Sequence, residues 1–264
     1  SSSSFESSES MELGSEGGDE DPGKVDLASK STSKGKDFLT QLEIYLAKRD
    51  GVDKLLKISR YATRIVLSSS IVSDDSLIGR LKSFESSVGV SRKAFRLGKF
   101  VQNINAVRSI SRSNPSLLLA LIAHGGEGLY YFIEQFVWLG KSGLIDKRHL
   151  PWLQRWSAWS EFIGYFGSVG LKLGELKIID DRERRVEIAI SRGIIGCEAE
   201  QEELRRLREK KTMKRLSVIQ DFADGLMALA DIRDGRGRLS APVIVSFAGL
   251  LSAVISTHKN WVSR

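Results

Sequence analysis

Apolar residues recur at intervals of three and four along most of the chain, which is the spacing of helices that bury one face. The pattern begins near Asp37, where Phe38, Leu42 and Tyr45 fall on one helical face. The 264 residues include only four prolines, and no stretch sustains the alternation of apolar and polar residues that indicates a β-strand. We therefore predict an all-α fold from residue 37 onward.

The first 36 residues differ from the rest because they are rich in serine and acid and hold only scattered apolar side chains. Such a segment buries too little apolar surface to offset the entropy lost on ordering, so we predict a disordered tail over residues 1–36. Two helices should follow, with a turn at Asp50-Gly51 between them. Asp53 is placed to cap the second of these helices.

A basic amphipathic helix is predicted over Leu77–Ile110. In its later half the aliphatic residues share one narrow sector, while Arg92, Arg96 and Lys99 gather on the opposite side. This pattern is typical of a helix that lies in a membrane interface, although a surface helix packed on a soluble core is the alternative. The predicted membrane-binding residues are Val90, Arg92, Lys93, Ala94, Arg96, Leu97, Lys99, Val101, Ile104 and Val107.

The centre of the chain is strongly apolar over Leu117–Ala123 and Leu129–Leu139 but carries Glu127 and Glu134. An acid at the middle of a bilayer costs about 2.5–3.5 kcal/mol, which argues against a simple membrane span here. The two acids are seven residues apart and share a helical face, so that face should turn toward other helices or toward headgroups.

A further helix should begin near Leu150-Pro151. Trp152, Trp156 and Trp159 stack on one of its sides, which favours a membrane interface. Gly170 and Gly174 form a GxxxG spacing that lets helices approach closely in a membrane. These two glycines are the predicted helix-packing residues, with a tight crossing in a soluble bundle as the alternative.

The C-terminal third contains a charged stretch and then an uncharged one. Residues 180–215 carry acid–base pairs such as Glu202 and Arg206 and are predicted to be a water-facing connector. Residues 239–257 hold no charge and are the best candidate for a membrane span. A helix over Pro242–Thr257 would rise only about 24 Å against a hydrocarbon core of about 30 Å, so basic flanks and Trp261 would anchor it. A buried core helix is the rival interpretation.

These segments give a domain plan of a tail and one helical membrane domain. The domain covers residues 37–264, and its parts are amphipathic helices over 37–112, hydrophobic and aromatic helices over 116–175, the connector over 180–215 and the C-terminal membrane segment over 239–257. The predicted fold class is thus a membrane-associated bundle of amphipathic and hydrophobic helices.

The net charge of +7 is concentrated in one place. The block from Arg80 to Arg112 holds eight Lys and Arg residues and one acid, Glu85, whereas the rest of the chain has 32 residues of each sign. Such a block indicates an anionic partner, either phospholipid or nucleic acid. Its basic face lacks the aromatic residues on which bases stack, so we expect an anionic phospholipid membrane and no nucleic acid.

The sequence offers little for catalysis. It contains one cysteine, Cys197, and three histidines that do not have the spacing of a zinc site. Residues 125–128 are rich in glycine but lack the lysine of a phosphate-binding loop, and no GxSxG elbow occurs. We therefore expect no enzyme activity, no catalytic residues, no metal site and no cofactor.

Three segments carry a resemblance to a known family. Residues 45–57, YLAKRDGVDKLLK, followed by Arg60-Tyr61, resemble the opening helices of peroxin-eleven proteins. Residues 130–146, YYFIEQFVWLGKSGLID, are similar to the central block of that family, most of all in its plant members, and the uncharged run before Trp261 is similar to its C-terminal membrane segment. The segments occur in the family's order, and the resemblance covers Asp37–Arg264.

The resemblance implies a peroxisomal membrane protein that elongates and tubulates the organelle before fission, promotes peroxisome proliferation, self-associates and works with the organelle-fission machinery. The bending helix of the family would correspond to Val90–Val107, entering one leaflet as a wedge. A channel or metabolite transporter, also suggested for the family, is the alternative, with Glu127, Glu134 and Glu161 lining a polar path. A soluble helical bundle with purely structural contacts is a further one.

Overall fold

A computed structural model describes residues 40–69, 71–111, 115–193 and 197–262. The predicted tail over residues 1–36 lies outside these residues. The chain divides into two compact units, Ser1–Ile44 and Tyr45–Arg264. In the first unit, residues 40–44 are described and are helical. Every regular element of the described residues is a helix, so the all-α prediction is confirmed.

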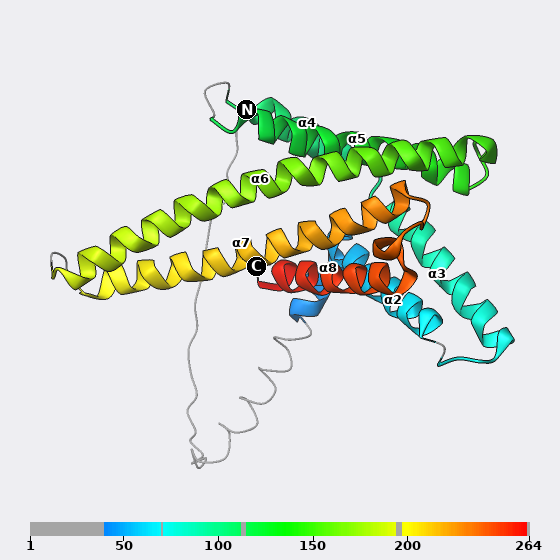
Figure 1. The fold of residues 1–264 in the computed structure, drawn as a ribbon, viewed down its shortest axis with the longest axis horizontal. Helices are drawn as coiled ribbons and strands as arrows, with labels where there is room; N and C mark the ends of the chain where they lie inside the picture. Colours follow the sequence, from blue (N-terminus) through cyan, green and yellow to red (C-terminus); the bar gives the residue numbers. More distant parts are fainter. Residues whose placement is uncertain (1–39, 70, 112–114, 194–196, 263–264) are drawn as a thin grey trace, which may run out of the picture. The chain divides into compact units, whose positions relative to one another are not determined.

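The second unit is built from seven α-helices in the described residues, joined by short loops (Figure 1). They are α2 (Arg49–Ser68), α3 (Asp75–Phe95), α4 (Phe100–Ser109), α5 (Leu117–Lys141), α6 (Leu150–Ser191), α7 (Cys197–Ile232) and α8 (Pro242–Val262), with the 3-10 helices η1 (Lys147–His149) and η2 (Arg238–Ser240) before α6 and α8. The predicted starts at Leu150-Pro151 and Pro242 are confirmed, because proline fits the first turn of a helix.

Two predicted boundaries are wrong. The turn expected at Asp50-Gly51 is absent, because α2 begins at Arg49 and runs through both residues. Gly51 serves packing instead, since a Cβ atom there would lie 2.0 Å from the carbonyl oxygen of Tyr45. Asp53 does not cap the helix either; its side chain is buried and faces α3.

The single helix predicted over Leu77–Ile110 is also wrong, because it is divided into α3 and α4. Asp74 begins α3 by accepting a hydrogen bond from the backbone N–H of Ser76. Gly98 separates the two helices with a φ of 73°, a left-handed conformation that favours glycine. The break divides the predicted membrane-binding residues between two helices and the turn that joins them.

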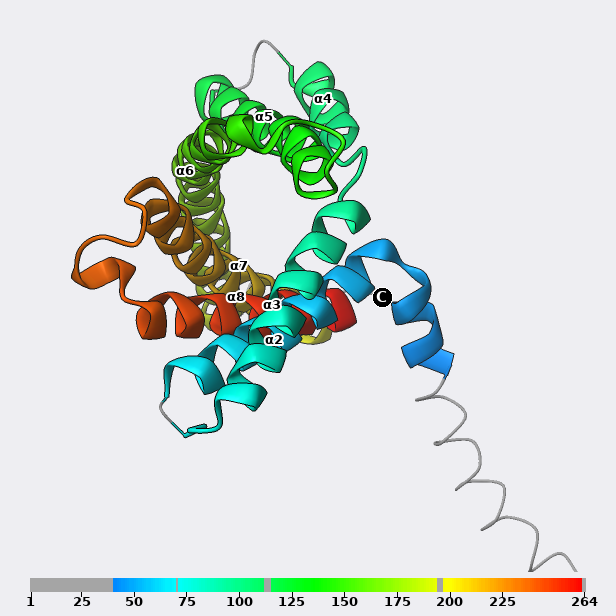
Figure 2. The same ribbon diagram turned by 90° about the vertical axis from the view of Figure 1, so that its right-hand side faces the viewer.

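Six helices of the second unit form a closed ring. α3 packs on α5, α5 on α6, α6 on α7, α7 on α8, α8 on α2, and α2 on α3. Figure 2 shows these helices surrounding a central space. α4 lies outside the ring and packs on α5, with the rings of Phe100 and Phe132 edge to face at 5.5 Å.

The backbones of α5 and α6 touch at glycines. A Cβ atom on Gly126 would lie 2.7 Å from Cα of Gly164, and one on Gly167 would lie 2.4 Å from the backbone nitrogen of Ala123. The predicted pair is placed differently: Gly170 contacts the side chain of Leu119, and Gly174 has no neighbouring atom within 4 Å of its Cβ position among the described residues. The close approach therefore lies one to two helical turns before the predicted one.

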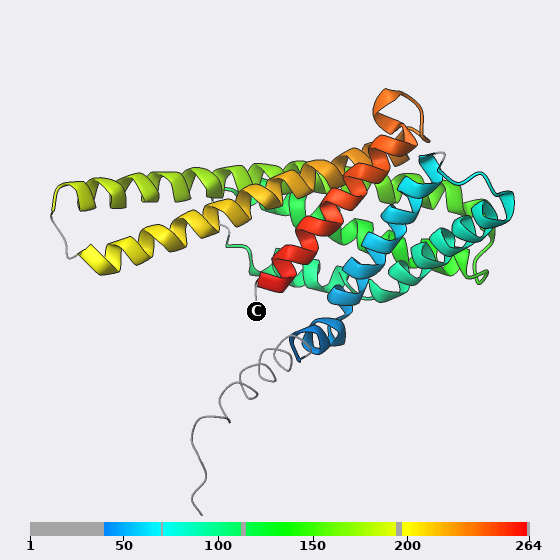
Figure 3. The ribbon, with the colours of Figure 1, turned by 90° about the horizontal axis from the view of Figure 1, so that it is seen from below.

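α6 and α7 form a long antiparallel hairpin whose far half extends beyond the neighbouring helices (Figures 1 and 3). This half contains the predicted connector over residues 180–215, which consists of the end of α6, a turn and the start of α7. Ion pairs join its two helices: Arg182 with Glu203, Arg208 with Glu183, and Lys211 with Asp180. Its charges thus serve partly to pair one helix with the other.

The outside of the ring carries many large apolar side chains, as in a protein whose solvent is lipid. The predicted tryptophan row on α6 is exposed, and so is one face of α8. Exposed examples are Leu129, Phe132 and Phe136 on α5, Trp152, Trp156, Trp159, Ile163 and Phe166 on α6, and Phe247, Leu251 and Val254 on α8. Among the described helices, α8 alone is long and apolar enough to cross a membrane.

Candidate functional site: a charged cavity inside the helical ring

The ring encloses a cavity of about 1200 Å³. Its wall is polar, in contrast to the apolar outside of the ring. Twelve lysines and arginines and eight acids line it, contributed by the helices of the ring and by the turn between α3 and α4. A buried charge needs a partner or water, so this interior is suited to polar solutes and not to apolar ligands.

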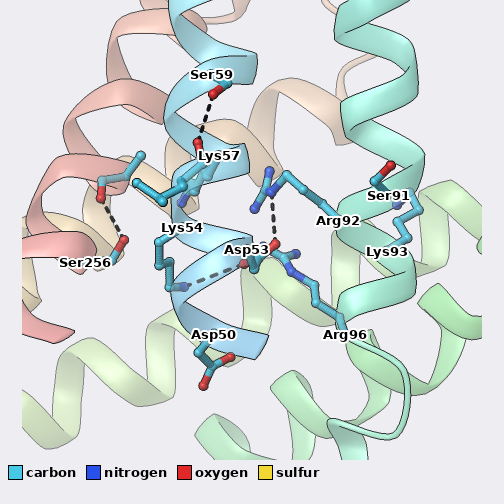
Figure 4. Close-up of polar contacts among 12 residues, drawn as sticks. Asp50, Asp53, Lys54, Lys57, Ser59, Ser91, Arg92, Lys93, Arg96 and Ser256 are labelled. Carbon is cyan, nitrogen blue, oxygen red and sulfur yellow. Dashed lines mark hydrogen bonds and ion pairs between the residues drawn. The ribbon is translucent and has the colours of Figure 1, made fainter. Parts of the chain in front are cut away.

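Asp53 on α2 is the centre of a charged cluster on this wall (Figure 4). Its carboxylate accepts a hydrogen bond at 3.0 Å from Nε of Arg92 and another at 3.2 Å from Nη2 of Arg96. Burial acts to raise the pKa of Asp53, but the two guanidinium groups and Lys54 outweigh it and hold that pKa well below its usual range. Asp53 is therefore ionised and ties α2 to α3.

A second buried cluster joins three helices. Nζ of Lys57 on α2 lies 2.7 Å from a carboxylate oxygen of Asp224 on α7 and 2.6 Å from Oγ of Ser252 on α8. Ser252 in turn donates to the same Asp224 oxygen at 2.6 Å. Because each group satisfies another, the cluster holds α2, α7 and α8 together within the wall.

A third cluster connects α3, α5 and α6. Lys93 pairs with Glu134, which also accepts a hydrogen bond from Ser157 at 3.1 Å. Arg96 donates to the hydroxyl of Tyr130 at 3.0 Å. Together the three clusters connect all six helices of the ring through their polar faces and leave their apolar faces outside.

The predicted membrane-binding residues fall into two groups. The four cations are in ion pairs: Arg92 and Arg96 with Asp53, Lys93 with Glu134, and Lys99 with Asp50. The six apolar residues are less enclosed, and Val101 and Ile104 on α4 are 46% and 48% exposed. Val90, Ala94, Leu97 and Val107 are half-buried. In this structure the basic face therefore meets acids of α2 and α5, and its contact with headgroups stays a prediction.

The three acids predicted to line a polar path do line the cavity. Glu134 is committed to its ion pair, whereas Glu127 and Glu161 take part in none of the ion pairs among the described residues. Glu161 accepts a hydrogen bond from the hydroxyl of Tyr165, also at the wall. Glu127 and Glu161 are thus the two of these acids that no ion pair holds among the described residues.

The sequence analysis missed Lys54, Lys57, Asp224 and Ser252 as site residues. One signal was available, because Asp221, Asp224 and Asp231 recur at spacings of three and seven in an otherwise apolar part of α7. Acids at that spacing share a helical face, and on an apolar helix such a face needs buried partners. Among the described residues no group of three or more His, Cys, Asp or Glu side chains is arranged to hold a metal ion.

An apolar exterior around a polar interior is typical of a helical membrane protein, and comparison with known proteins identifies the family. The family model Peroxisomal biogenesis factor 11 (PEX11) matches residues 39–261. The chain is 62% identical to Peroxisomal membrane protein 11A of Arabidopsis thaliana, over 87% of this chain and 95% of that protein. It is 54% identical to Peroxisomal membrane protein 11-3 of Oryza sativa subsp. japonica, over 86% and 90% respectively.

This chain therefore belongs to the PEX11 family, and the predicted family and the predicted localisation in the peroxisomal membrane are confirmed. A third relative, Peroxisomal membrane protein 11-2 of Oryza sativa subsp. japonica, is 44% identical over 89% of this chain. These relatives are named as membrane proteins and not as enzymes. No solved structure matches the chain.

Proposed function

We propose that this protein elongates and tubulates the peroxisomal membrane before fission by inserting the apolar stripe of α4 into one leaflet. The observation that carries the proposal is the exposed position of Val101 and Ile104 on a short helix outside the ring. α4 is attached to α5 through Phe100, and Asn103 is buried on the same side, which leaves Val101 and Ile104 about half exposed.

The physical mechanism is a wedge. Full burial of an aliphatic side chain stabilises by about 1.5–3 kcal/mol. Val101 and Ile104 are about half exposed, so insertion would supply about half of that free energy for each. Insertion from one side expands that leaflet alone and favours positive curvature. Self-association of many copies would concentrate the wedges along a tubule, on which the organelle-fission machinery would then act.

The four cations would strengthen insertion only when their ion pairs open. A cation near an anionic membrane surface contributes about 1 kcal/mol. Arg108 at the end of α4 is exposed, and it makes no ion pair among the described residues, so it is the basic residue already available to headgroups. Insertion therefore begins with the apolar stripe and Arg108, and release of Arg96 and Lys99 would follow.

The double variant Val101→Asp/Ile104→Asp should abolish tubulation by the full chain reconstituted in vesicles of phosphatidylcholine and phosphatidylserine. Each aspartate opposes insertion by roughly 2–3 kcal/mol, which is more than the stripe has to gain. Tubules are counted by electron microscopy. The matched control is Gln102→Asp/Ser109→Asp, which adds the same two charges to exposed positions of α4 outside the stripe. Tubulation by the Val101→Asp/Ile104→Asp variant at the wild-type level would remove α4 from the mechanism.

A second candidate function, a channel or metabolite transporter, is supported by the cavity. The full chain with Cys197→Ser and Glu161→Cys should conduct in a planar bilayer and lose conductance when a methanethiosulfonate reagent modifies the new thiol at the cavity wall. Ile163→Cys is the control, because Ile163 is exposed on the outside of the same helix and would face lipid, where a thiol does not ionise. Equal sensitivity of the two variants, or no conductance, would exclude this function.

A further inference from the structure

One corner of the cavity wall holds more cations than its carboxylates can neutralise. The cations of this corner are Lys54, Lys57, Arg92, Arg96 and Lys99, all of which line the cavity. Their carboxylate partners are Asp50, Asp53 and Asp224. The cations of this corner therefore outnumber the carboxylates that pair with them by two, at a largely buried position where desolvation makes an incompletely paired charge costly.

Lys54 is the cation with the weakest pairing. Its Nζ lies 3.9 Å from Oδ2 of Asp53, and that carboxylate already accepts shorter hydrogen bonds from Arg92 and Arg96. The side chain of Lys54 is only 17% exposed. Burial and the neighbouring cations, offset in part by Asp53, lower the pKa of Lys54 to about 7. Figure 4 shows Lys54 beside the Asp53 cluster on α2.

Arg96 also has an unused hydrogen-bond donor at this corner. Its Nη1 donates to Tyr130 and its Nη2 to Asp53, but its Nε is buried and has no hydrogen-bond partner among the described residues. A buried donor without a partner costs about 1–3 kcal/mol, more when it is charged. Lys99, from the turn after Arg96, brings its ammonium group to the same part of the wall, 5.3 Å from the ring centre of Tyr131.

We propose that this corner binds a phosphate monoester, with Lys54, Arg96 and Lys99 as its main ligands. A phosphate monoester carries a charge of about −1.5 to −2 near pH 7, which would compensate the excess of cations and favour the protonated form of Lys54. Its three terminal oxygens accept several charge-assisted hydrogen bonds at once, as an ammonium group and a free guanidinium N–H require. The site lies on the cavity wall and not on the stripe of α4. It shares Arg96 and Lys99 with the insertion proposed above, whereas Lys54, the residue that the titration tests, belongs to the site alone.

The phosphate can come from a soluble phosphate ester or from the headgroup of phosphatidic acid, since both present the same monoester. Isothermal titration of the full chain in a neutral detergent with glycerol 3-phosphate tests the shared chemistry. We expect one saturable site whose Kd rises by about tenfold or more in Lys54→Gln, because a charge-assisted contact is lost. The control is Lys141→Gln, which removes a cation from the lining of the same cavity outside this corner and should change Kd less than about twofold.

Folding does not confound this comparison. Lys54→Gln removes an incompletely paired buried cation and should leave the unfolding temperature unchanged or higher, and Lys54→Arg should restore binding because it restores the charge. The titration repeated in nanodiscs with and without phosphatidic acid separates the two sources: competition identifies the lipid headgroup, and its absence identifies the soluble ester. If neither probe binds, or if Lys54→Gln and Lys141→Gln bind as the wild type does, the proposal is overturned.

Discussion

Replacing Asp53 with asparagine should lower the free energy of unfolding of the full chain by about 3–5 kcal/mol, the usual cost of removing one partner from a buried ion pair. The Asp53 carboxylate is the only acid paired with Arg92 and Arg96 in the described residues, and its side chain is 2% exposed. Asparagine keeps the shape but not the charge, so both guanidinium groups would remain buried without a counter-charge. Loss of this cluster would weaken the packing of α2 on α3.

Asp50→Asn is the matched control, because it removes the same charge one helical turn away. The side chain of Asp50 is 56% exposed and pairs with Lys99 alone. Such surface pairs contribute about 0–1 kcal/mol. Denaturant unfolding of the full chain in neutral detergent, followed by circular dichroism, measures both variants. Equal destabilisation by the two substitutions would show that the Asp53 cluster is not a structural centre.

The Asp53 cluster also shows why the basic helix was only partly predictable from sequence. The apolar stripe and the cations can be read from helical periodicity, but only the last part of the stripe lies on α4, where Val101 and Ile104 are exposed. The partners of the cations cannot be read in this way, because Asp53 and Glu134 lie 39 residues before Arg92 and 41 residues after Lys93. A local pattern shows that one face of a helix is basic, but it does not show which other helix packs against that face.

The helices themselves were more predictable than their arrangement. Proline at the start of α6 and α8 and the long apolar runs of α5 and α8 are local signals, and these helices lie where the pattern places them. The break at Gly98 follows from the freedom of glycine to adopt a positive φ, which the periodicity of apolar residues does not reveal. The helical start of α2 depends on the close approach of Gly51 to Tyr45, which outweighs the low helix propensity of glycine. The cavity depends on the closed order of six helices, and no spacing in the sequence specifies that order.

A second large effect on stability is expected at the crossing of α5 and α6. Gly167→Ala places a methyl group 2.4 Å from the backbone nitrogen of Ala123 and 2.7 Å from the carbonyl oxygen of Leu119. Both atoms belong to the backbone of α5 and cannot move away by a change of rotamer. The two helices must therefore separate. Overpacking of this kind costs about 1–3 kcal/mol or more, which exceeds the gain of about 0.5–1 kcal/mol from replacing glycine with alanine inside a helix.

Gly174→Ala separates these two effects. Gly174 lies on the same helix, two turns later, and a Cβ atom there has no neighbour within 4 Å among the described residues. This variant should therefore show only the gain of about 0.5–1 kcal/mol from the helix, whereas Gly167→Ala should be destabilised. Thermal unfolding of the full chain in the same detergent compares them directly. If Gly174→Ala is the destabilised variant, the close helix contact lies at the GxxxG pair after all, between copies of the chain and not within one.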